Sequence, residues 1–190
     1  MAKTLFELLE HIPDDAVISV TGDTIVDGPI VESTDDVQEH GVFVARKGRS
    51  VDGHDFIPQA IARGAAAIIG ESDISGLPVP YVRLTDTQKY LGVLAAAYHD
   101  FPSRSMVIIG VTGTDGKTTT STLIHSILKL ATGGRAGYIS TIAADLGSST
   151  ADTGLHVTTP GAPQVQGYLA QMRDAGLTHA VLEMTSHGLA

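Results

Sequence analysis

The stretch Gly110-Val-Thr-Gly-Thr-Asp-Gly-Lys-Thr-Thr-Thr120 decides the fold of this 190-residue chain. An apolar, β-branched run, Met106–Val111, leads into it, and a segment with helical periodicity follows it. A glycine-rich turn between a buried strand and a helix lets phosphates approach the backbone, so that its N–H groups and the helix N-terminus face the anion. Lys117 would neutralise transferred charge, and the Thr118 hydroxyl could ligate Mg²⁺. The stretch therefore predicts a nucleoside-triphosphate site.

The generic phosphate-loop pattern has a glycine five residues before Gly116, whereas this chain has Val111 there and Gly110 one position earlier. The alternative interpretation is a tight strand-to-helix turn with an incidental lysine. We expect the following residues to contact the phosphates: Gly113, Thr114, Asp115, Gly116, Lys117, Thr118 and Thr119.

Apolar periodicity predicts the rest of this second unit. The helix after the turn is expected to bury Leu123, Ile124, Ile127 and Leu128. Two further strands and one helix are predicted, at Arg135–Ile142, Thr178–Met184 and Val165–Ala175. Alternating strands and helices favour right-handed crossovers and a parallel sheet. Open doubly wound sheets carry about five or six strands, so we expect the first half of such a domain here.

The first unit reads as a small mixed α/β domain. Helices are predicted at Thr4–His11, Asp55–Arg63 and Thr87–His99, and strands at Ala16–Val20, Thr24–Val31, Gly41–Ala45, Ala66–Ile69 and Val79–Leu84. Asp100-Phe-Pro-Ser-Arg104 breaks the last helix, because proline disfavours helix at the preceding residue. We therefore predict two domains, residues 1–103 and 104–190.

Composition narrows the class of protein. Hydrophobic residues make up 43% of the chain and charged residues 17%, values ordinary for a globular protein. The net charge of −9 argues against a nucleic-acid partner, which would call for a basic patch. The chain has no cysteine, no basic leader at Met1–Glu10 and no apolar run long enough to span a membrane, so we expect a cytoplasmic protein with no membrane partner.

Glu183 ends the buried strand run Ala180-Val-Leu182, which we expect beside the strand of the glycine-rich stretch. Ligands collect at the carboxyl ends of parallel strands, and a carboxylate there can hold Mg²⁺. The alternative is a solvated acid at a strand end. Because the glycine-rich stretch independently calls for a metal partner, we favour the metal role.

The spacing of the glycine-rich stretch resembles that of the Mur ligases and of their folylpolyglutamate and cyanophycin relatives. Glu32-Ser-Thr34, Gly41-Val-Phe-Val-Ala45 and Gly48-Arg-Ser-Val-Asp-Gly-His-Asp-Phe-Ile57 resemble the UDP-binding domain of the tripeptide- and pentapeptide-forming members, a domain that folylpolyglutamate synthetase lacks. His156-Val-Thr-Thr-Pro160 and Leu182-Glu-Met-Thr-Ser-His-Gly-Leu189 resemble segments typical of the members that add the third amino acid. The resemblance covers essentially the whole chain.

This resemblance implies an ATP- and Mg²⁺-dependent ligase of peptidoglycan synthesis. ATP would phosphorylate the free carboxylate of UDP-N-acetylmuramoyl-L-alanyl-D-glutamate, and the amine of an incoming amino acid would attack the acyl phosphate. Lys117, Glu183 and His187 would serve catalysis, with Thr118 and Glu183 at the metal. The substrate would contact Ser33, Arg49, Ser50, Thr158, Thr159 and Ser186. We expect a monomer at full length.

Asp115, Thr185 and Ser140 depart from the residues usual in the family, namely asparagine, serine and glycine. The family's modified lysine, adenine-contacting residues and amino-acid-binding domain would lie beyond position 190, so we expect this chain alone not to turn over. The identity of the added amino acid is left open. Two alternatives stay open as well: a noncatalytic module that binds the UDP precursor or a nucleotide, and the pentapeptide-forming relative.

Overall fold

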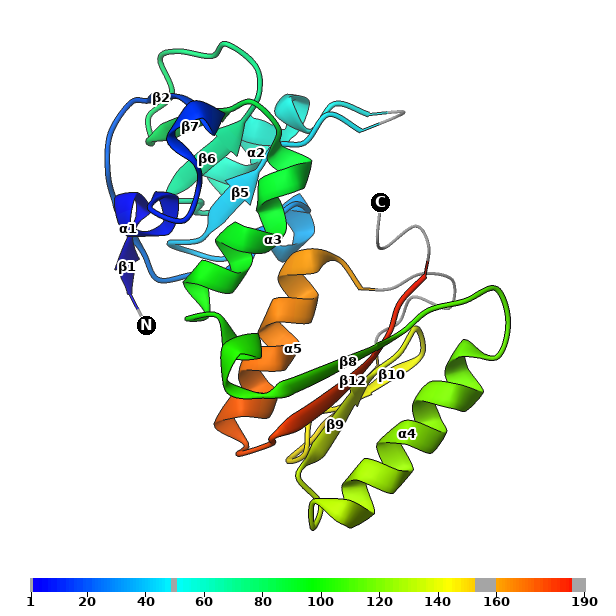
Figure 1. Ribbon diagram of the computed structural model, residues 1–190. Coiled ribbons are helices and arrows are strands. Elements are labelled where there is room, and N and C mark those ends of the chain that lie inside the picture. The colour runs from blue at the N-terminus through cyan, green and yellow to red at the C-terminus, as the bar shows by residue number, and fades with distance from the viewer. Residues whose placement is uncertain (1, 49–50, 153–159, 186–190) are drawn as a thin grey trace. The chain divides into compact units, whose positions relative to one another are not determined.

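The computed structural model describes residues 2–48, 51–152 and 160–185. The chain forms two compact units, Met1–Asp100 and Phe101–Ala190 (Figure 1). The boundary along the chain falls between Asp100 and Phe101, which both have positive φ angles, 57° and 50°. Backbone in this left-handed region turns the chain sharply. The α/β class predicted from the sequence is confirmed.

A five-stranded, mostly parallel sheet forms the centre of the first unit. Its strands in spatial order are β2 (Val17–Val20), β7 (Tyr81–Leu84), β6 (Ala67–Gly70), β5 (Val42–Val44) and β4 (Ile30–Val31). The four strands from β7 to β4 are parallel, and β2 runs antiparallel to β7. A two-stranded pair, β1 (Lys3–Thr4) and β3 (Ile25–Val26), lies outside this sheet. The expected single strand Thr24–Val31 is therefore two, β3 and β4, because Pro29 between them has no N–H to continue a ladder.

Three helices accompany this sheet: α1 (Leu5–Leu9), α2 (Ile57–Ala62) and α3 (Thr87–Tyr98). Short 3₁₀ turns connect the elements at Asp14–Ala16, Thr34–Asp36 and Gly53–Phe56. Phe43 and Ile68, from neighbouring strands, pack against Ile57 of α2. The Asp86 carboxylate caps α3 by accepting from the Lys89 N–H at 2.9 Å. The apolar side chains of β5 and β6 are buried, so these two strands lie in the core of the unit.

The second unit is a five-stranded sheet between two helices (Figure 1). Its strands in spatial order are β11 (Thr150–Asp152), β10 (Ala143–Asp145), β9 (Ala136–Ile139), β12 (His179–Glu183) and β8 (Val107–Val111). The strands β9, β12 and β8 are parallel, as predicted. Helix α4 (Lys117–Ala131) lies on one face and α5 (Ala162–Asp174) on the other, and a 3₁₀ turn, Pro102–Ser105, precedes β8.

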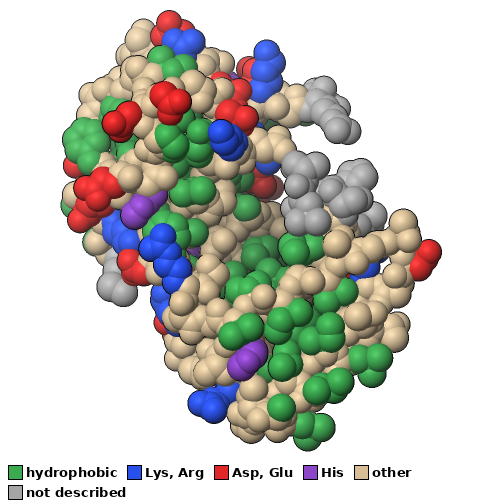
Figure 2. Space-filling model, viewed as in Figure 1, with side chains coloured by type: hydrophobic (Ala, Val, Ile, Leu, Met, Phe, Trp, Pro, Cys, Tyr) green, Lys and Arg blue, Asp and Glu red, His purple; other side chains and the backbone are tan. Residues whose placement is uncertain are grey.

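Two features of the second unit differ from the sequence prediction. An antiparallel hairpin, β10–β11, extends the sheet beyond β9. Helix α4 buries the expected apolar face only in part, since Ile124 and Leu128 are half-buried whereas Leu123 and Ile127 are 59% and 65% exposed. Its buried residue is Ser121, whose hydroxyl donates to the Lys117 carbonyl at 2.8 Å. Figure 2 shows hydrophobic side chains gathered on this part of the surface.

Candidate functional site

The glycine-rich stretch forms a loop between β8 and α4, as predicted. Gly116 is the N-cap of α4 and has a φ of 73°, a left-handed conformation that glycine adopts without steric cost. Helix α4 begins at Lys117, so the unpaired N–H groups of its first turn face the loop. This is the arrangement that binds an anion through backbone donors and the helix dipole.

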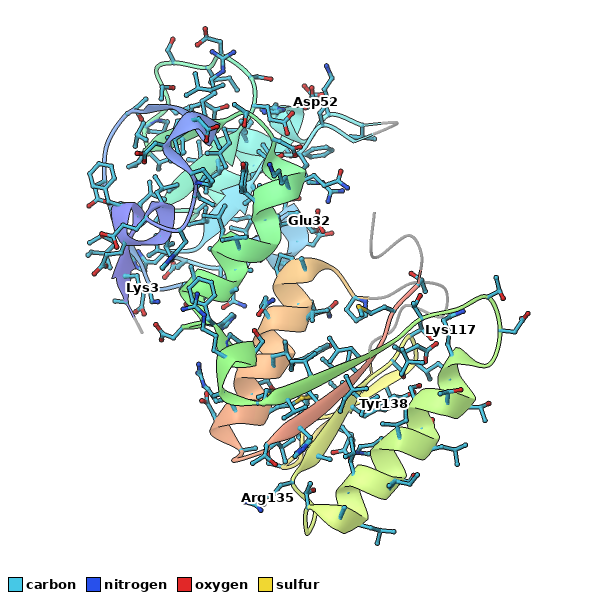
Figure 3. All side chains as sticks on the ribbon, viewed as in Figure 1. Lys3, Glu32, Asp52, Lys117, Arg135 and Tyr138 are labelled. Atoms are coloured by element: carbon cyan, nitrogen blue, oxygen red, sulfur yellow. The ribbon has the colours of Figure 1, made fainter. Side chains whose placement is uncertain are left out.

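The Lys117 ammonium lies over this loop. It donates to the carbonyls of Gly113 at 2.9 Å and Thr114 at 3.1 Å. Figure 3 shows Lys117 at the loop end of α4. Asp115 and Thr119 are exposed on the same loop and first turn. A positive charge therefore lies within a few ångströms of the backbone that the sequence predicts to hold phosphates.

The metal residues predicted from the sequence, Thr118 and Glu183, are in direct contact. Parallel pairing of β12 with β8 sets Glu183 opposite Val111, at the ends of both strands. The Thr118 hydroxyl, in the first turn of α4, donates to Glu183 Oε1 at 3.0 Å. Glu183 is only 2% exposed, so its carboxylate is fixed in a buried position at the edge of the loop.

These two side chains fit a magnesium ion in their chemistry. Mg²⁺ prefers oxygen ligands and commonly keeps several waters and substrate phosphates beside one or two protein groups. A hydroxyl and a carboxylate oxygen at hydrogen-bond distance, next to the phosphate loop, offer such ligands. Within residues 2–48, 51–152 and 160–185 no group of three or more histidine or acidic side chains could hold a metal.

Tyr138 is a neighbour of Glu183 that the sequence reasoning missed. It lies on β9, and its hydroxyl donates to Glu183 Oε2 at 3.5 Å. The same hydroxyl is 3.3 Å from Ser121 Oγ, and the His125 ring stacks on the Tyr138 ring with centroids 5.5 Å apart. No local sequence signal marked Tyr138, because the pairing of β9 with β12 joins segments far apart in the chain.

The carboxylate of Asp145, a residue of β10, is held in its charged form. Asp145 accepts from Lys129 Nζ at 2.6 Å, and His125 Nε2 lies 3.6 Å away. Burial raises the pKa of Asp145, but the hydrogen bonds from Lys129 and from the Gly147 N–H outweigh it. The pKa of Asp145 is therefore below its ordinary value.

A second candidate site is a cavity of about 410 Å³ in the first unit. We call it the first-unit pocket, and its lining residues are Glu32, Ser33, Thr34, Phe43, Arg46, Gly48, Val51, Gly53 and Phe56. Glu32 follows β4 and Arg46 follows β5, so the pocket lies at the carboxyl ends of two parallel strands. Ligands of open α/β sheets bind at such ends.

Backbone contacts join Arg46 and Lys47 to Asp52 and Gly53 beside this pocket. The Gly53 N–H donates to the Arg46 carbonyl at 2.7 Å, and Lys47 forms an isolated antiparallel bridge with Asp52. A Cβ at Gly53 would lie 2.6 Å from the Arg46 oxygen, so only glycine fits there. The close contact therefore fixes the backbone from which the Arg46 side chain extends.

His54 anchors the same segment to β6. Its Nε2 accepts from the N–H groups of Glu71 at 3.0 Å and Ser72 at 3.3 Å, so Nδ1 carries the proton and donates to Asp52 at 2.5 Å. The hydrogen bond from the His54 backbone N–H, followed by that from its ring, lowers the pKa of Asp52. His54 is not among the site residues predicted from the sequence.

The predicted substrate residues divide into two groups. Ser33 lines the first-unit pocket, and its hydroxyl accepts from the Asp35 N–H at 3.2 Å. The others lie outside the described residues, as does the predicted catalytic histidine: Arg49, Ser50, Thr158, Thr159, Ser186 and His187.

Ser140, one of the three departures, has a clear local role. Its side chain is 2% exposed and donates to the Ala143 carbonyl at 2.9 Å. It also accepts from the N–H groups of Ile142 and Ala143. Ser140 therefore closes the turn from β9 into the hairpin that the sequence did not predict.

Two family profiles match the chain. The profile described as "Mur ligase middle domain" matches residues 111–190, and that described as "Mur ligase family, catalytic domain" matches residues 35–99. The first begins at the end of β8 and contains the phosphate loop and Glu183, and the second contains most of the first-unit pocket.

Curated relatives are similar over almost the whole chain. A "UDP-N-acetylmuramyl-tripeptide synthetase" from Roseiflexus sp. strain RS-1 is 39% identical over 188 residues, which cover 98% of this chain and 36% of the relative. A "UDP-N-acetylmuramoyl-L-alanyl-D-glutamate--2,6-diaminopimelate ligase" from Chlorobium phaeobacteroides is 38% identical, with the same coverage of 98% and 36%. The chain thus spans about a third of the length of these relatives.

A solved structure supports the fold and the nucleotide site. The MurF ligase from Thermotoga maritima in complex with ADP superposes with a TM-score of 0.56 at 29% identity. The match covers 84% of this chain and 32% of that one. The relative was thus solved with a nucleotide of the kind that the loop between β8 and α4 is suited to bind.

Proposed function

Since the chain belongs to the Mur ligase family, we propose that it supplies the UDP-precursor-binding domain and the first part of the ATP-binding domain of a peptidoglycan ligase. The proposed reaction adds the third amino acid to UDP-N-acetylmuramoyl-L-alanyl-D-glutamate with hydrolysis of ATP to ADP and phosphate. The domains proposed from the sequence are residues 1–103 and 104–190. The activity is proposed for a protein of the relatives' length, of which this chain spans about a third.

The observation that carries the proposal is the contact of Thr118 with Glu183 beside the Gly113–Lys117 loop. It joins two oxygen ligands to a loop that presents backbone donors and one ammonium group. Phosphoryl transfer depends mainly on positioning and on stabilising charge, and it requires no protein nucleophile. The site therefore suits transfer of the γ-phosphoryl group of ATP.

Each side chain of this site has a role in that transfer. The loop N–H groups and Lys117 bind the phosphates and offset the charge that builds up on the transferred group. Thr118 and Glu183 would hold Mg²⁺, which supplies further neutralisation of phosphate charge when bound. The carboxylate of the UDP-linked dipeptide attacks the γ-phosphorus, giving an acyl phosphate and ADP. The amine of the amino acid then displaces phosphate and forms the amide.

The first-unit pocket is proposed to bind the UDP portion of the substrate. The exposed ring of Phe56 suits a flat base, and the Ser33 and Thr34 hydroxyls suit a sugar or phosphate. Arg49, Ser50, Thr158, Thr159 and Ser186 stay proposed substrate residues, and His187 a proposed catalytic one, on the strength of the resemblance alone. The identity of the amino acid is not part of the proposal.

The cellular setting follows from the same proposal. The nucleotide-linked precursor and ATP are cytoplasmic compounds, which supports a cytoplasmic enzyme. That the full-length enzyme acts as a monomer is proposed on the resemblance alone. No helix in the part of the chain that the structure describes is long and apolar enough to cross a membrane.

A second candidate is the pentapeptide-forming ligase, because the ADP-bound MurF ligase is 29% identical to this chain. That enzyme would take a UDP-linked tripeptide in place of the dipeptide. The names of the curated relatives at 38% and 39% identity favour the earlier step.

Calorimetric titration of the chain with UDP-N-acetylmuramoyl-L-alanyl-D-glutamate tests the proposal, with UDP and the UDP-linked tripeptide as comparisons. We expect saturable binding that is tighter for the dipeptide than for UDP or the tripeptide. Preference for the tripeptide would favour the pentapeptide-forming step. Failure of every UDP compound to bind a folded sample, shown to be folded by its circular dichroism spectrum, would contradict the proposal for the first unit.

A further inference from the structure

We propose that Arg46 binds the diphosphate of the UDP-bearing substrate in the first-unit pocket and that Glu32 positions its guanidinium. This inference rests on the proposed function, since it concerns the ligand of the same pocket. Neither residue is among the substrate contacts that the resemblance implies, although Glu32 belongs to the Glu32-Ser-Thr34 stretch that carries it. The two stand at the ends of the adjacent parallel strands β4 and β5.

The charge balance of the protein calls for a local cation in this pocket. The chain carries a net charge of −9, so its overall field opposes an approaching diphosphate. Among the described residues that line the pocket, Arg46 is the one with a positive charge. Arg63 and Arg83 do not line the pocket and pair with Asp35 and Asp73.

The guanidinium of Arg46 forms an ion pair with Glu32 that uses only part of its N–H donors. Its NH1 group lies 3.0 Å from Glu32 Oε2. A guanidinium has five N–H donors in one plane, so one ion pair leaves donors that match the oxygens of a phosphate. The side chains of Arg46 and Glu32 are 37% and 32% exposed, which leaves them accessible to a ligand.

Hydrogen bonds hold the backbone of Arg46 and of the residue before it in place. The Gly53 N–H bonds to its carbonyl, and the preceding residue, Ala45, donates to Ile69 of β6 at 2.7 Å. Glu32 is the residue directly after β4, which pairs with β5. The guanidinium is therefore presented from a rigid base, which lowers the entropic cost of binding.

A purely structural role for the pair makes a different prediction. Partly exposed ion pairs contribute little to stability, so loss of this one should leave the fold intact. If the pair only joined the ends of β4 and β5, its loss would affect all pocket ligands alike. If Arg46 binds phosphate, its loss should weaken the binding of UDP and leave the binding of uridine nearly unchanged.

The test compares Arg46→Gln with Lys47→Gln in calorimetric titrations with UDP and uridine. Lys47 is exposed, adjacent and equally charged, and it does not line the pocket, so it controls for long-range charge. We expect Arg46→Gln to weaken UDP binding about tenfold or more and uridine binding less than about twofold. Lys47→Gln should change both by less than about threefold. Glu32→Gln should retain uridine affinity and bind UDP at least as well, because the amide oxygen still accepts from Arg46.

Equal UDP losses in the Arg46 and Lys47 variants would overturn the inference and leave the proposed function standing. An equal loss of UDP and uridine in Arg46→Gln would also overturn it, since that pattern indicates a disturbed pocket. If the wild-type chain bound no UDP, both the proposed function of the first unit and this inference would be contradicted. Arg46→Lys, which keeps the charge without the planar fork, should recover part of the UDP affinity.

Discussion

The hydroxyl of Thr118 donates to the buried carboxylate of Glu183 across 3.0 Å, although 65 positions separate the two residues in sequence. Thr118 comes from the first turn of α4 and Glu183 from the end of β12. The parallel pairing of β12 with β8 brings them together, because it sets both strand ends at the edge where the loop begins.

We expect Thr118→Val to reduce the affinity for Mg²⁺-ATP by about tenfold or more, which corresponds to about 1.4 kcal/mol. The substitution keeps the shape of the side chain and removes the oxygen that would ligate the metal. Affinity for ATP in excess EDTA should change little. Fluorescence titration with a labelled ATP analogue, with and without Mg²⁺, measures both values.

Thr120→Val is the matched control, since Thr120 is exposed two residues further along the same helix. Thr118→Ser should retain the Mg²⁺-dependent affinity because it keeps the hydroxyl. An equal effect of Mg²⁺ on the wild type and on Thr118→Val would remove this residue from the metal site.

Asp115→Asn should leave ATP affinity unchanged within about twofold. A carboxylate in contact with a phosphate would be repelled by an energy of order a few kcal/mol. Asp115 is exposed on the loop, however, so water and salt screen its charge. Titration with Mg²⁺-ATP at low and at physiological salt measures the difference, and a tenfold change in either direction would show that Asp115 faces the phosphates.

Met172→Ala should destabilise the second unit by about 2–5 kcal/mol, the range typical of a fully buried methionine. Met172 is 0% exposed on α5 and packs in a cluster with Ile139 and Leu177. Urea denaturation followed by circular dichroism gives the change in the free energy of unfolding. Leu130→Ala serves as the control, because Leu130 is 86% exposed and its truncation should cost less than about 0.5 kcal/mol.

Asp145→Asn should lower stability at neutral pH and lose this effect in acid. Burial raises the pKa of Asp145, but its bonds with Lys129 and Gly147 lower it further, so the folded pKa is below that of the unfolded chain. The stabilising contribution is therefore fully present above the unfolded pKa of about 3.9 and disappears as pH falls through the folded pKa. Urea denaturation of both proteins between about pH 7 and pH 2.5 measures the difference. A difference that grew with acidity would contradict the assignment.

Local sequence patterns were sufficient for much of the second unit. The apolar run before Gly110 and the periodic segment after Lys117 predicted strand, loop and helix, and Gly116 indeed has the left-handed φ that its position demands. Glu183 was predicted at a buried strand end because an apolar run leads up to it. Steric and periodic constraints act between residues close in sequence, so a single sequence reveals them.

The tertiary structure decided which side chains meet. Periodicity assigned Leu123 and Ile127 to the buried face of α4, yet both are exposed, because apolar spacing does not specify which face lies on the sheet. The hairpin β10–β11 depends on the turn that Ser140 closes. The pairing of Arg46 with Glu32 depends on the register of β5 against β4.

The sequence by itself thus determined the α/β class and the phosphate-binding loop of this protein. Only the tertiary structure determined the contact of Tyr138 with Glu183 and the composition of the first-unit pocket. The physical reason is that strand register and helix orientation are set by packing between segments far apart in the chain, whose energies no local pattern records.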